Sequence, residues 1–131
     1  MTFFSMKLRH IIVSLTIIPL IAWGQNASSN LTLGTYSSSS NSTINTMKIS
    51  NKGAKTIVEF SVANKTGCTG EVSGELKLTS NNHYLFDKND ADGKCSINVQ
   101  KLRNGFRVEE DSCINFHGIS CDFSSSLKKI K

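Results

Sequence analysis

A strict alternation of apolar and polar residues constrains this sequence more than any other feature. Val58, Phe60 and Val62 share one face while Ile57, Glu59 and Ser61 take the other, and similar alternation recurs at residues 95–100 and 106–109. A period of two is typical of half-buried β-strands, whose side chains point to opposite faces in turn. From Gln25 to Lys131 no segment keeps helical spacing for three turns, and this part contains no proline. The sequence therefore predicts an all-β domain.

Clusters of turn-forming residues divide the alternating runs into about eight short strands. We expect them near residues 31–36, 43–50, 55–63, 71–79, 82–87, 95–102, 105–110 and 124–130. The strongest hairpin signal is Asn104-Gly105, because a type I′ turn needs positive φ at both central residues. Eight strands at this spacing predict a small antiparallel barrel or a closed sandwich. Residues 25–46 are rich in Ser and Asn, which favours a partly mobile entry strand and loop over a packed element.

The N-terminus has the pattern of an export signal. A short basic stretch, Lys7 to His10, precedes 13 uncharged residues, Ile11 to Trp23. This run is shorter than the roughly 20 apolar residues of a membrane span and matches the core of a signal peptide. Small residues at Ala22 and Gly24 predict a signal peptide at 1–24, which leaves 107 of the 131 residues as one domain, 25–131. We expect no stable membrane insertion after cleavage.

The charge of the expected domain argues against nucleic-acid binding. Without Lys7 and Arg9, 13 basic residues stand against 10 acidic ones, for a net charge of +3. The basic residues are scattered, apart from Lys128, Lys129 and Lys131 near the C-terminus. A nucleic-acid interface requires a clustered basic patch with aromatic platforms. We therefore expect no nucleic-acid partner.

All four cysteines, Cys68, Cys95, Cys113 and Cys121, lie in the expected domain. An even number in a short exported chain is typical of a disulfide framework. A zinc site is the alternative, but the spacings of 27, 18 and 8 residues contain no paired C-x-x-C knuckle. In an up-and-down meander all four thiols fall at one end of the barrel. Three pairings remain possible, and we favour Cys68–Cys95 and Cys113–Cys121 as neighbours in the meander.

The segment between the last two cysteines is the candidate binding site. A bridge between Cys113 and Cys121 would close a small loop around four side chains: Ile114, Phe116, His117 and Ile119. A closed loop is already ordered, which lowers the entropic cost of binding, and its apolar side chains could anchor in a partner's pocket. The alternative is that Phe116 and Ile119 plug the barrel end while His117 bonds a nearby carbonyl.

Catalytic and metal sites are weakly indicated. Two serines and two aspartates, Ser112, Ser120, Asp111 and Asp122, lie near His117 in the sequence, but nothing places a serine on a strained elbow or beside an oxyanion hole. Residues 87–93 resemble a calcium loop, yet Ala91 occupies a ligand position and Asn98 stands where the loop needs glutamate. We expect no enzymatic activity, no metal and no cofactor.

Several short motifs accompany the cysteines: Cys68-Thr-Gly-Glu71, Gly74, Cys95-Ser-Ile-Asn-Val99, Val108-Glu-Glu-Asp-Ser-Cys113, Phe116-His-Gly118 and Cys121-Asp-Phe123. Together they resemble a cystine-stabilised β module of bacterial envelope proteins described as lysozyme-inhibitor-like. The resemblance covers about Gly34 to Leu127 and implies a Gram-negative periplasm and an antiparallel barrel or sandwich. It also implies binding to a cell-wall-degrading enzyme. The Ser and Lys motifs with which periplasmic lysozyme inhibitors enter the lysozyme cleft have no full counterpart here, so no inhibitory residue is assigned.

These features predict an exported, monomeric protein-binding domain, periplasmic or secreted. Its partner would be another protein, such as a secreted hydrolase or toxin that an inhibitor or immunity-type protein counteracts. The alternative is a structural or small-ligand-binding envelope module without inhibitory activity. A roomy apolar barrel interior would favour that alternative.

Overall fold

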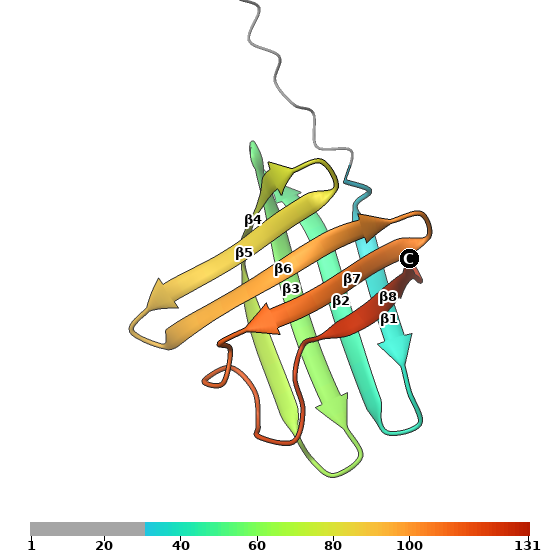
Figure 1. Ribbon diagram of the computed structural model, residues 1–131, viewed down its shortest axis with the longest axis vertical. Coiled ribbons are helices and arrows are strands. Elements are labelled where there is room, and N and C mark those ends of the chain that lie inside the picture. Colours follow the sequence, from blue (N-terminus) through green and yellow to red (C-terminus); the bar gives the residue numbers. More distant parts are fainter. Residues whose placement is uncertain (1–30) are drawn as a thin grey trace, which may run out of the picture.

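The computed structural model describes residues 31–131, and the predicted signal peptide at 1–24 lies outside the described residues. Eight antiparallel strands follow one another around a closed barrel, and the last strand returns to pair with the first (Figure 1). They are β1 (Gly34–Ser39), β2 (Thr43–Lys52), β3 (Lys55–Asn64), β4 (Thr69–Ser80), β5 (His83–Asp90), β6 (Gly93–Leu102), β7 (Gly105–Asp111) and β8 (Ser125–Lys129). The prediction of an all-β domain of about eight strands is confirmed.

Every second residue of each strand faces the interior of the barrel, as the alternation predicts. On β3, for example, Val58, Phe60 and Val62 are buried while Glu59 is exposed. The rings of Phe60 and Phe86 meet edge to face, with centroids 5.7 Å apart. In the part of the chain that the structure describes, such apolar side chains form one continuous core inside the barrel.

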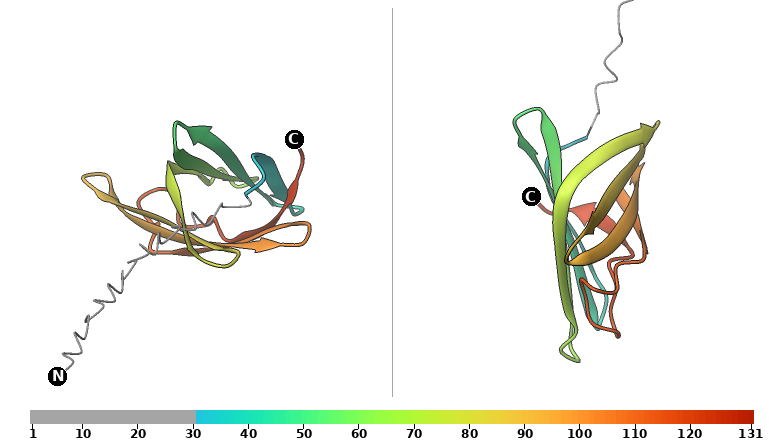
Figure 2. Two further views of the ribbon diagram at one scale, coloured as in Figure 1. Left: turned by 90° about the horizontal axis from the view of Figure 1, so that it is seen from above. Right: turned by 90° about the vertical axis from the view of Figure 1, so that its left-hand side faces the viewer.

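The two ends of the barrel differ in how the strands are connected. Seen from above, β1–β3 and β5–β7 form opposite walls of a flattened barrel (Figure 2). One end holds the β1–β2, β3–β4 and β5–β6 turns and the long connection from β7 to β8, residues 112–124. We call this connection the cap loop and this end the cap end. The β2–β3, β4–β5 and β6–β7 turns lie at the other end, which we call the far end.

The Ser/Asn-rich segment contributes two packed strands, β1 and the first part of β2, joined by an exposed turn at residues 40–42. Tyr36 of β1 is buried, and its ring meets Phe106 edge to face at a centroid distance of 4.8 Å. Asn45 of β2 is also buried and donates a hydrogen bond from Nδ2 to the carbonyl oxygen of Asp122, at 2.8 Å. The expectation that this segment lacks a packed element is therefore wrong for β1 and β2, because Tyr36 and Asn45 point into the barrel and are buried there.

The β6–β7 turn differs from the predicted hairpin. Leu102 pairs with Gly105, so the two-residue turn is Arg103-Asn104, and neither Asn104 nor Gly105 takes a positive φ. The expected type I′ turn at Asn104-Gly105 is therefore wrong. Gly105 is needed for a different reason, since a Cβ at this position would overlap the carbonyl oxygen of Leu127 on β8. Glycine allows the two backbones to approach closely.

Candidate functional site

The cap loop crosses the cap end as a short strand-like segment beside β4. Glu71 donates its backbone N–H to the carbonyl oxygen of Phe116 at 3.0 Å, and Gly118 donates to that of Thr69 at 3.2 Å. Gly70 faces the loop between these bonds, where a Cβ would overlap the Cβ of His117. The start of β4 therefore provides a backbone template for the loop, and glycine makes the approach possible.

Two disulfides tie the two ends of the cap loop to the barrel, but they are not the predicted pairs. Cys95 is bonded to Cys113 and Cys68 to Cys121, and the described residues contain no free cysteine. The prediction that all four cysteines gather at one barrel end is confirmed, and both disulfides indicate an oxidising, extracytoplasmic environment.

The predicted pairs, Cys68–Cys95 and Cys113–Cys121, are wrong for a geometrical reason. Cys68 and Cys95 lie at the starts of β4 and β6, and β5 runs between these strands. Two interstrand steps of about 4.8 Å each exceed the Cα separation of about 7 Å that a disulfide can bridge. Cys113 instead follows β7, which is hydrogen-bonded to β6, and its Cα lies 4.1 Å from that of Cys95.

Two asparagines hold the second half of the cap loop in place. The Nδ2 of Asn64 donates to the carbonyl oxygen of Ser120 at 3.2 Å, two residues before Asp122, whose carbonyl accepts the bond from Asn45. The Oδ1 of Asn64 accepts the backbone N–H of Cys68 at 2.9 Å, so the same side chain also orders the β3–β4 turn. The loop is thus fixed by side chains of β2 and β3 as well as by the disulfides.

Phe123 fills the cap end, and the sequence reasoning missed it. Its side chain is 2% exposed, and its ring centroid lies 6.3 Å from that of Phe60 and 5.2 Å from that of His117. The plug that the sequence suggested was Phe116 with Ile119. Phe116 is partly buried against the core, whereas Ile119 is 98% exposed. Ile119 is therefore no plug.

Phe116 and His117 hold the cap loop to the barrel rather than present themselves to solvent. The Nζ of Lys88 lies 5.5 Å from the centre of the Phe116 ring, within the range of a cation–π interaction. His117 Nε2 lies 2.8 Å from Oε1 of Glu110, and its Nδ1 lies 2.7 Å from the carbonyl oxygen of Gly118. The carbonyl oxygen of Gly118 can only accept, so Nδ1 donates to it, and a proton on Nε2 as well would let the charged ring donate to Glu110.

The Glu110 carboxylate is the centre of this arrangement. On β7 it follows Val108 on the inward face, and its Oε2 accepts the backbone N–H of Phe123 at 2.8 Å. The side chains of His117 and Glu110 are 7% and 15% exposed. Burial alone would lower the pKa of His117. The hydrogen bonds to Gly118 and Glu110 and the charges of Glu110 and Asp122 outweigh burial and raise this pKa above its ordinary value of 6.5.

A raised pKa in the folded state makes the stability of the cap end depend on pH. The contribution of His117 is fully present below its ordinary pKa of 6.5 and is lost as the pH rises through the raised folded-state value. We expect Glu110→Gln to lower the His117 pKa and to flatten this part of the stability profile. Thermal unfolding from about pH 5 to about pH 9 and an NMR titration of the His117 ring would measure both effects.

Asp111→Asn is the matched control, since it removes the same charge from the neighbouring, exposed position of β7. It should leave most of the pH dependence in place. An unchanged profile in Glu110→Gln would contradict the charged pair.

The cap loop exposes the two isoleucines of the predicted set. Ile114 is 69% exposed and Ile119 is 98% exposed, each close to a disulfide. The structure therefore divides the four predicted site residues into two groups. Phe116 and His117 contact the barrel, and Ile114 and Ile119 point into solvent.

Neither the hydrolytic trio nor the calcium loop considered from the sequence is assembled. The ring nitrogens of His117 are occupied by Glu110 and Gly118, and the Oγ of Ser112 bonds Oδ1 of Asp111 at 3.2 Å. At the β5–β6 turn, Asp90 Oδ1 accepts the backbone N–H of Asp92 at 2.9 Å. Within residues 31–131, no group of three or more His, Cys, Asp or Glu side chains is placed to hold a metal ion.

Residues 31–131 contain no helix of the length and apolar character needed to cross a membrane. Comparisons of the chain with models of protein families, with curated proteins and with solved structures find no match.

Proposed function

We propose that the protein is an exported binding domain that engages a partner protein through the cap loop. The observation that carries this proposal is Ile119, which is 98% exposed on a loop tied to the barrel at both ends by disulfides. Burying an isoleucine side chain contributes roughly 1.5–3 kcal/mol. A partner with an apolar pocket would gain this free energy, and Ile114 offers a second contact on the same loop.

The fixed position of the loop supports binding as much as its composition does. When a mobile loop becomes ordered at an interface, each immobilised side chain costs roughly 0.5–1.5 kcal/mol of binding free energy. Here the disulfides, the backbone bonds to β4 and the bonds from Asn45 and Asn64 have already ordered the chain. A rigid scaffold that displays variable loop residues is a common arrangement in binding proteins.

An extracytoplasmic location would restrict the partner to proteins that are found outside the cytoplasm. The two disulfides favour an extracytoplasmic location, and the predicted signal peptide would direct the domain to the periplasm or to secretion. A partner in the same compartment, such as a cell-wall hydrolase or a secreted toxin, suits an inhibitor or immunity-type role. The resemblance of the cysteine pattern to lysozyme-inhibitor-like modules supports the same class.

Ile119→Asp and Ile114→Asp test the proposal directly. Each should weaken binding of the partner by about tenfold or more, since truncating an anchor of an interface costs roughly 1–4 kcal/mol. The melting temperature should barely change, because both side chains are exposed in the free domain. The oxidised domain would be immobilised, its partner captured from periplasmic extract and identified by mass spectrometry, and the affinity measured by calorimetry with the purified pair.

Ile130→Asp is the matched control, since Ile130 is 59% exposed and follows β8 at the far end. It should bind the captured partner as well as the native chain does. A partner that binds all three variants equally would contradict a site on the cap loop.

A further inference from the structure

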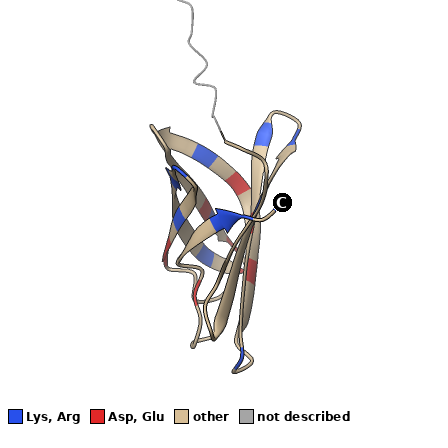
Figure 3. Ribbon diagram, turned by 90° about the vertical axis from the view of Figure 1, so that its right-hand side faces the viewer, with Lys and Arg blue, Asp and Glu red and all other residues tan. Residues whose placement is uncertain are grey.

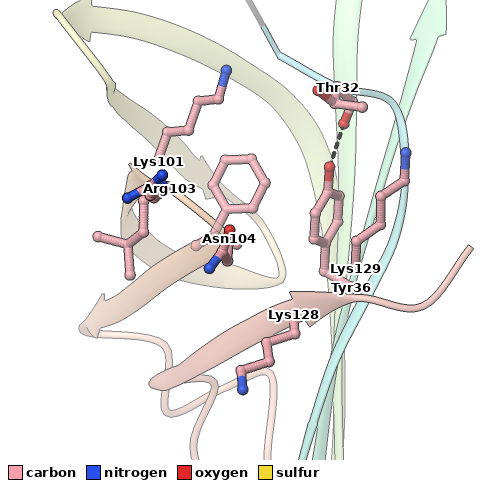
Figure 4. A pocket seen from close by; sticks show the side chains of 10 residues that line it. Thr32, Tyr36, Lys101, Arg103, Asn104, Lys128 and Lys129 are labelled. Carbon is pink, nitrogen blue, oxygen red and sulfur yellow. Dashed lines mark hydrogen bonds between the residues drawn. The ribbon is translucent and has the colours of Figure 1, made fainter.

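A second feature, a cavity of about 430 Å³, opens at the far end of the barrel, away from the cap loop. Its lining includes the buried rings of Tyr36 and Phe106 and the side chains of Lys101, Arg103 and Lys129 (Figure 4). The volume lies within the roughly 300–1,000 Å³ that is usual for small-molecule sites. We call this cavity the basic pocket.

The period of two brings lysines to the inner side of the barrel mouth. On β6 the inward positions Ile97 and Val99 are followed by Lys101, and on β8 the inward Leu127 is followed by Lys129. Residues two apart on a strand share a face, so both lysines stand where the apolar series predicts another core residue. They extend from opposite sides of the pocket (Figure 4).

The charge around this pocket has one sign. Its lining contains four basic residues, Lys101, Arg103, Lys128 and Lys129, and no carboxylate. Arg103, Lys128 and Lys129 take no part in the ion pairs that join Lys55 to Glu75, Lys88 to Asp90 and His117 to Glu110.

The rest of the far end adds to this positive potential. The β2–β3 hairpin carries Lys52 as well as Lys55, whose charge is offset by Glu75, and basic segments are visible on that hairpin and on β8 (Figure 3). At the cap end, exposed carboxylates (Asp92, Asp111 and Asp122) stand beside exposed lysines (Lys65 and Lys94), so the two signs of charge are mixed there. A cleft lined by one sign of charge concentrates counter-ions, so the far end attracts anions.

The floor of the pocket is aromatic and rigid. Tyr36 and Phe106 are 4% and 2% exposed, and their rings meet edge to face at 4.8 Å. The hydroxyl of Tyr36 donates to the carbonyl oxygen of Thr32 at 2.7 Å, which fixes the ring. The pocket thus combines charged donors at its rim with an apolar floor that could contact the carbon skeleton of a ligand.

The donors suit a phosphate group better than a single carboxylate. Arg103 offers the planar guanidinium that binds phosphate through two parallel bonds, and Lys129 offers a point charge with three donors. Asn104, which also lines the pocket, adds an amide donor. A phosphate monoester carries about −1.5 to −2 at neutral pH, so it compensates this cluster more fully than a carboxylate.

We propose that the basic pocket binds the phosphate group of an organic phosphate. The site lies at the end of the barrel opposite the cap loop, so it is independent of the proposed protein-binding site. The phosphate could belong to a small soluble molecule or to the headgroup of an anionic lipid. The two sources share the same chemistry at Arg103 and Lys129 and are separated by experiment.

An NMR titration of the isotope-labelled, oxidised domain at about 50 mM salt would test the proposal. The probes are glucose 6-phosphate, glucose as the neutral counterpart and gluconate as the carboxylate counterpart. Glucose 6-phosphate should shift the amide signals of Asn104, Gly105 and Phe106 and bind more tightly than gluconate. Vesicles of phosphatidylglycerol, with phosphatidylcholine as their control, form the lipid arm.

The double variant Arg103→Gln/Lys129→Gln should weaken phosphate binding by about tenfold or more. Both side chains are exposed, so folding should be unaffected, which the melting temperature would verify. Lys48→Gln/Lys77→Gln is the matched control, since it removes the same charge from two exposed positions outside the pocket. It should change the affinity by less than about twofold.

Each outcome of these measurements either supports or overturns phosphate binding at the basic pocket. Binding of glucose 6-phosphate that the pocket variant loses and the control keeps supports a soluble organic phosphate. Binding to phosphatidylglycerol vesicles alone, with the same dependence on the variants, supports a lipid headgroup. Equal loss in the control variant, equal affinity for gluconate, or no binding in either arm would overturn the proposal.

Discussion

Phe123→Ala is expected to lower the free energy of unfolding by roughly 3–5 kcal/mol, the cost of removing a buried phenylalanine ring from a packed core. Phe123 is 2% exposed, and its ring lies against Phe60 inside the barrel and His117 of the cap loop. Neither neighbour can move into the vacated space, because Phe60 is held by β3 and His117 by Glu110. Denaturant unfolding of the oxidised protein would measure the loss.

Two other residues of the cap loop are the controls. Phe116 is partly buried, so Phe116→Ala should cost less than Phe123→Ala, and Ile119→Ala should change the free energy of unfolding by less than about 0.5 kcal/mol. The opposite order, with Phe116→Ala the more damaging, would mean that Phe116 is the plug. That result would restore the alternative interpretation of the sequence, in which Phe116 plugs the barrel end.

Much of the barrel was predictable because its walls follow one rule. Inward and outward positions alternate along β3, β6 and β7, and turn-forming residues separate the runs, so eight strands could be placed within a few residues. The alternation does not predict where two backbones approach each other closely. Gly105 was interpreted as a turn residue, but the carbonyl oxygen of Leu127 on β8 requires the glycine, and β8 is distant in the sequence.

The sequence could predict where the candidate site lies but not the role of each of its residues. The cysteines and apolar residues of 113–121 directed attention to the cap loop, which is where the structure places two exposed isoleucines. Beyond β7 the alternation ends, so no period indicated that Phe123 points inward or that Glu110 reaches His117. The inward lysines of β6 and β8 could have been found, since each continues the register of a buried residue.

Removing the bridge between Cys68 and Cys121 is expected to destabilise the domain more than removing the bridge between Cys95 and Cys113. A disulfide restricts the unfolded chain, and the entropy lost grows with the length of the loop that it closes. The sequence separations are 53 and 18 residues. With the chain-entropy relation these loops correspond to about 4 and about 3 kcal/mol of the free energy of unfolding at 25 °C.

The loss of side-chain packing on substitution by alanine favours the opposite order of destabilisation. The experiment must therefore keep packing the same in the two states that it compares. Cys95 and Cys113 are at most 1% exposed, whereas Cys68 and Cys121 are each 8% exposed, so substitution by alanine leaves the larger packing defect at the short bridge. The remedy is to retain one bridge in each double variant and compare its oxidised and reduced forms, in which the same side chains are present. The difference in the Cys95→Ala/Cys113→Ala protein then reports the long bridge, and the difference in the Cys68→Ala/Cys121→Ala protein reports the short one. If the short bridge contributed as much as the long one, loop entropy would not be the dominant source of their stabilisation.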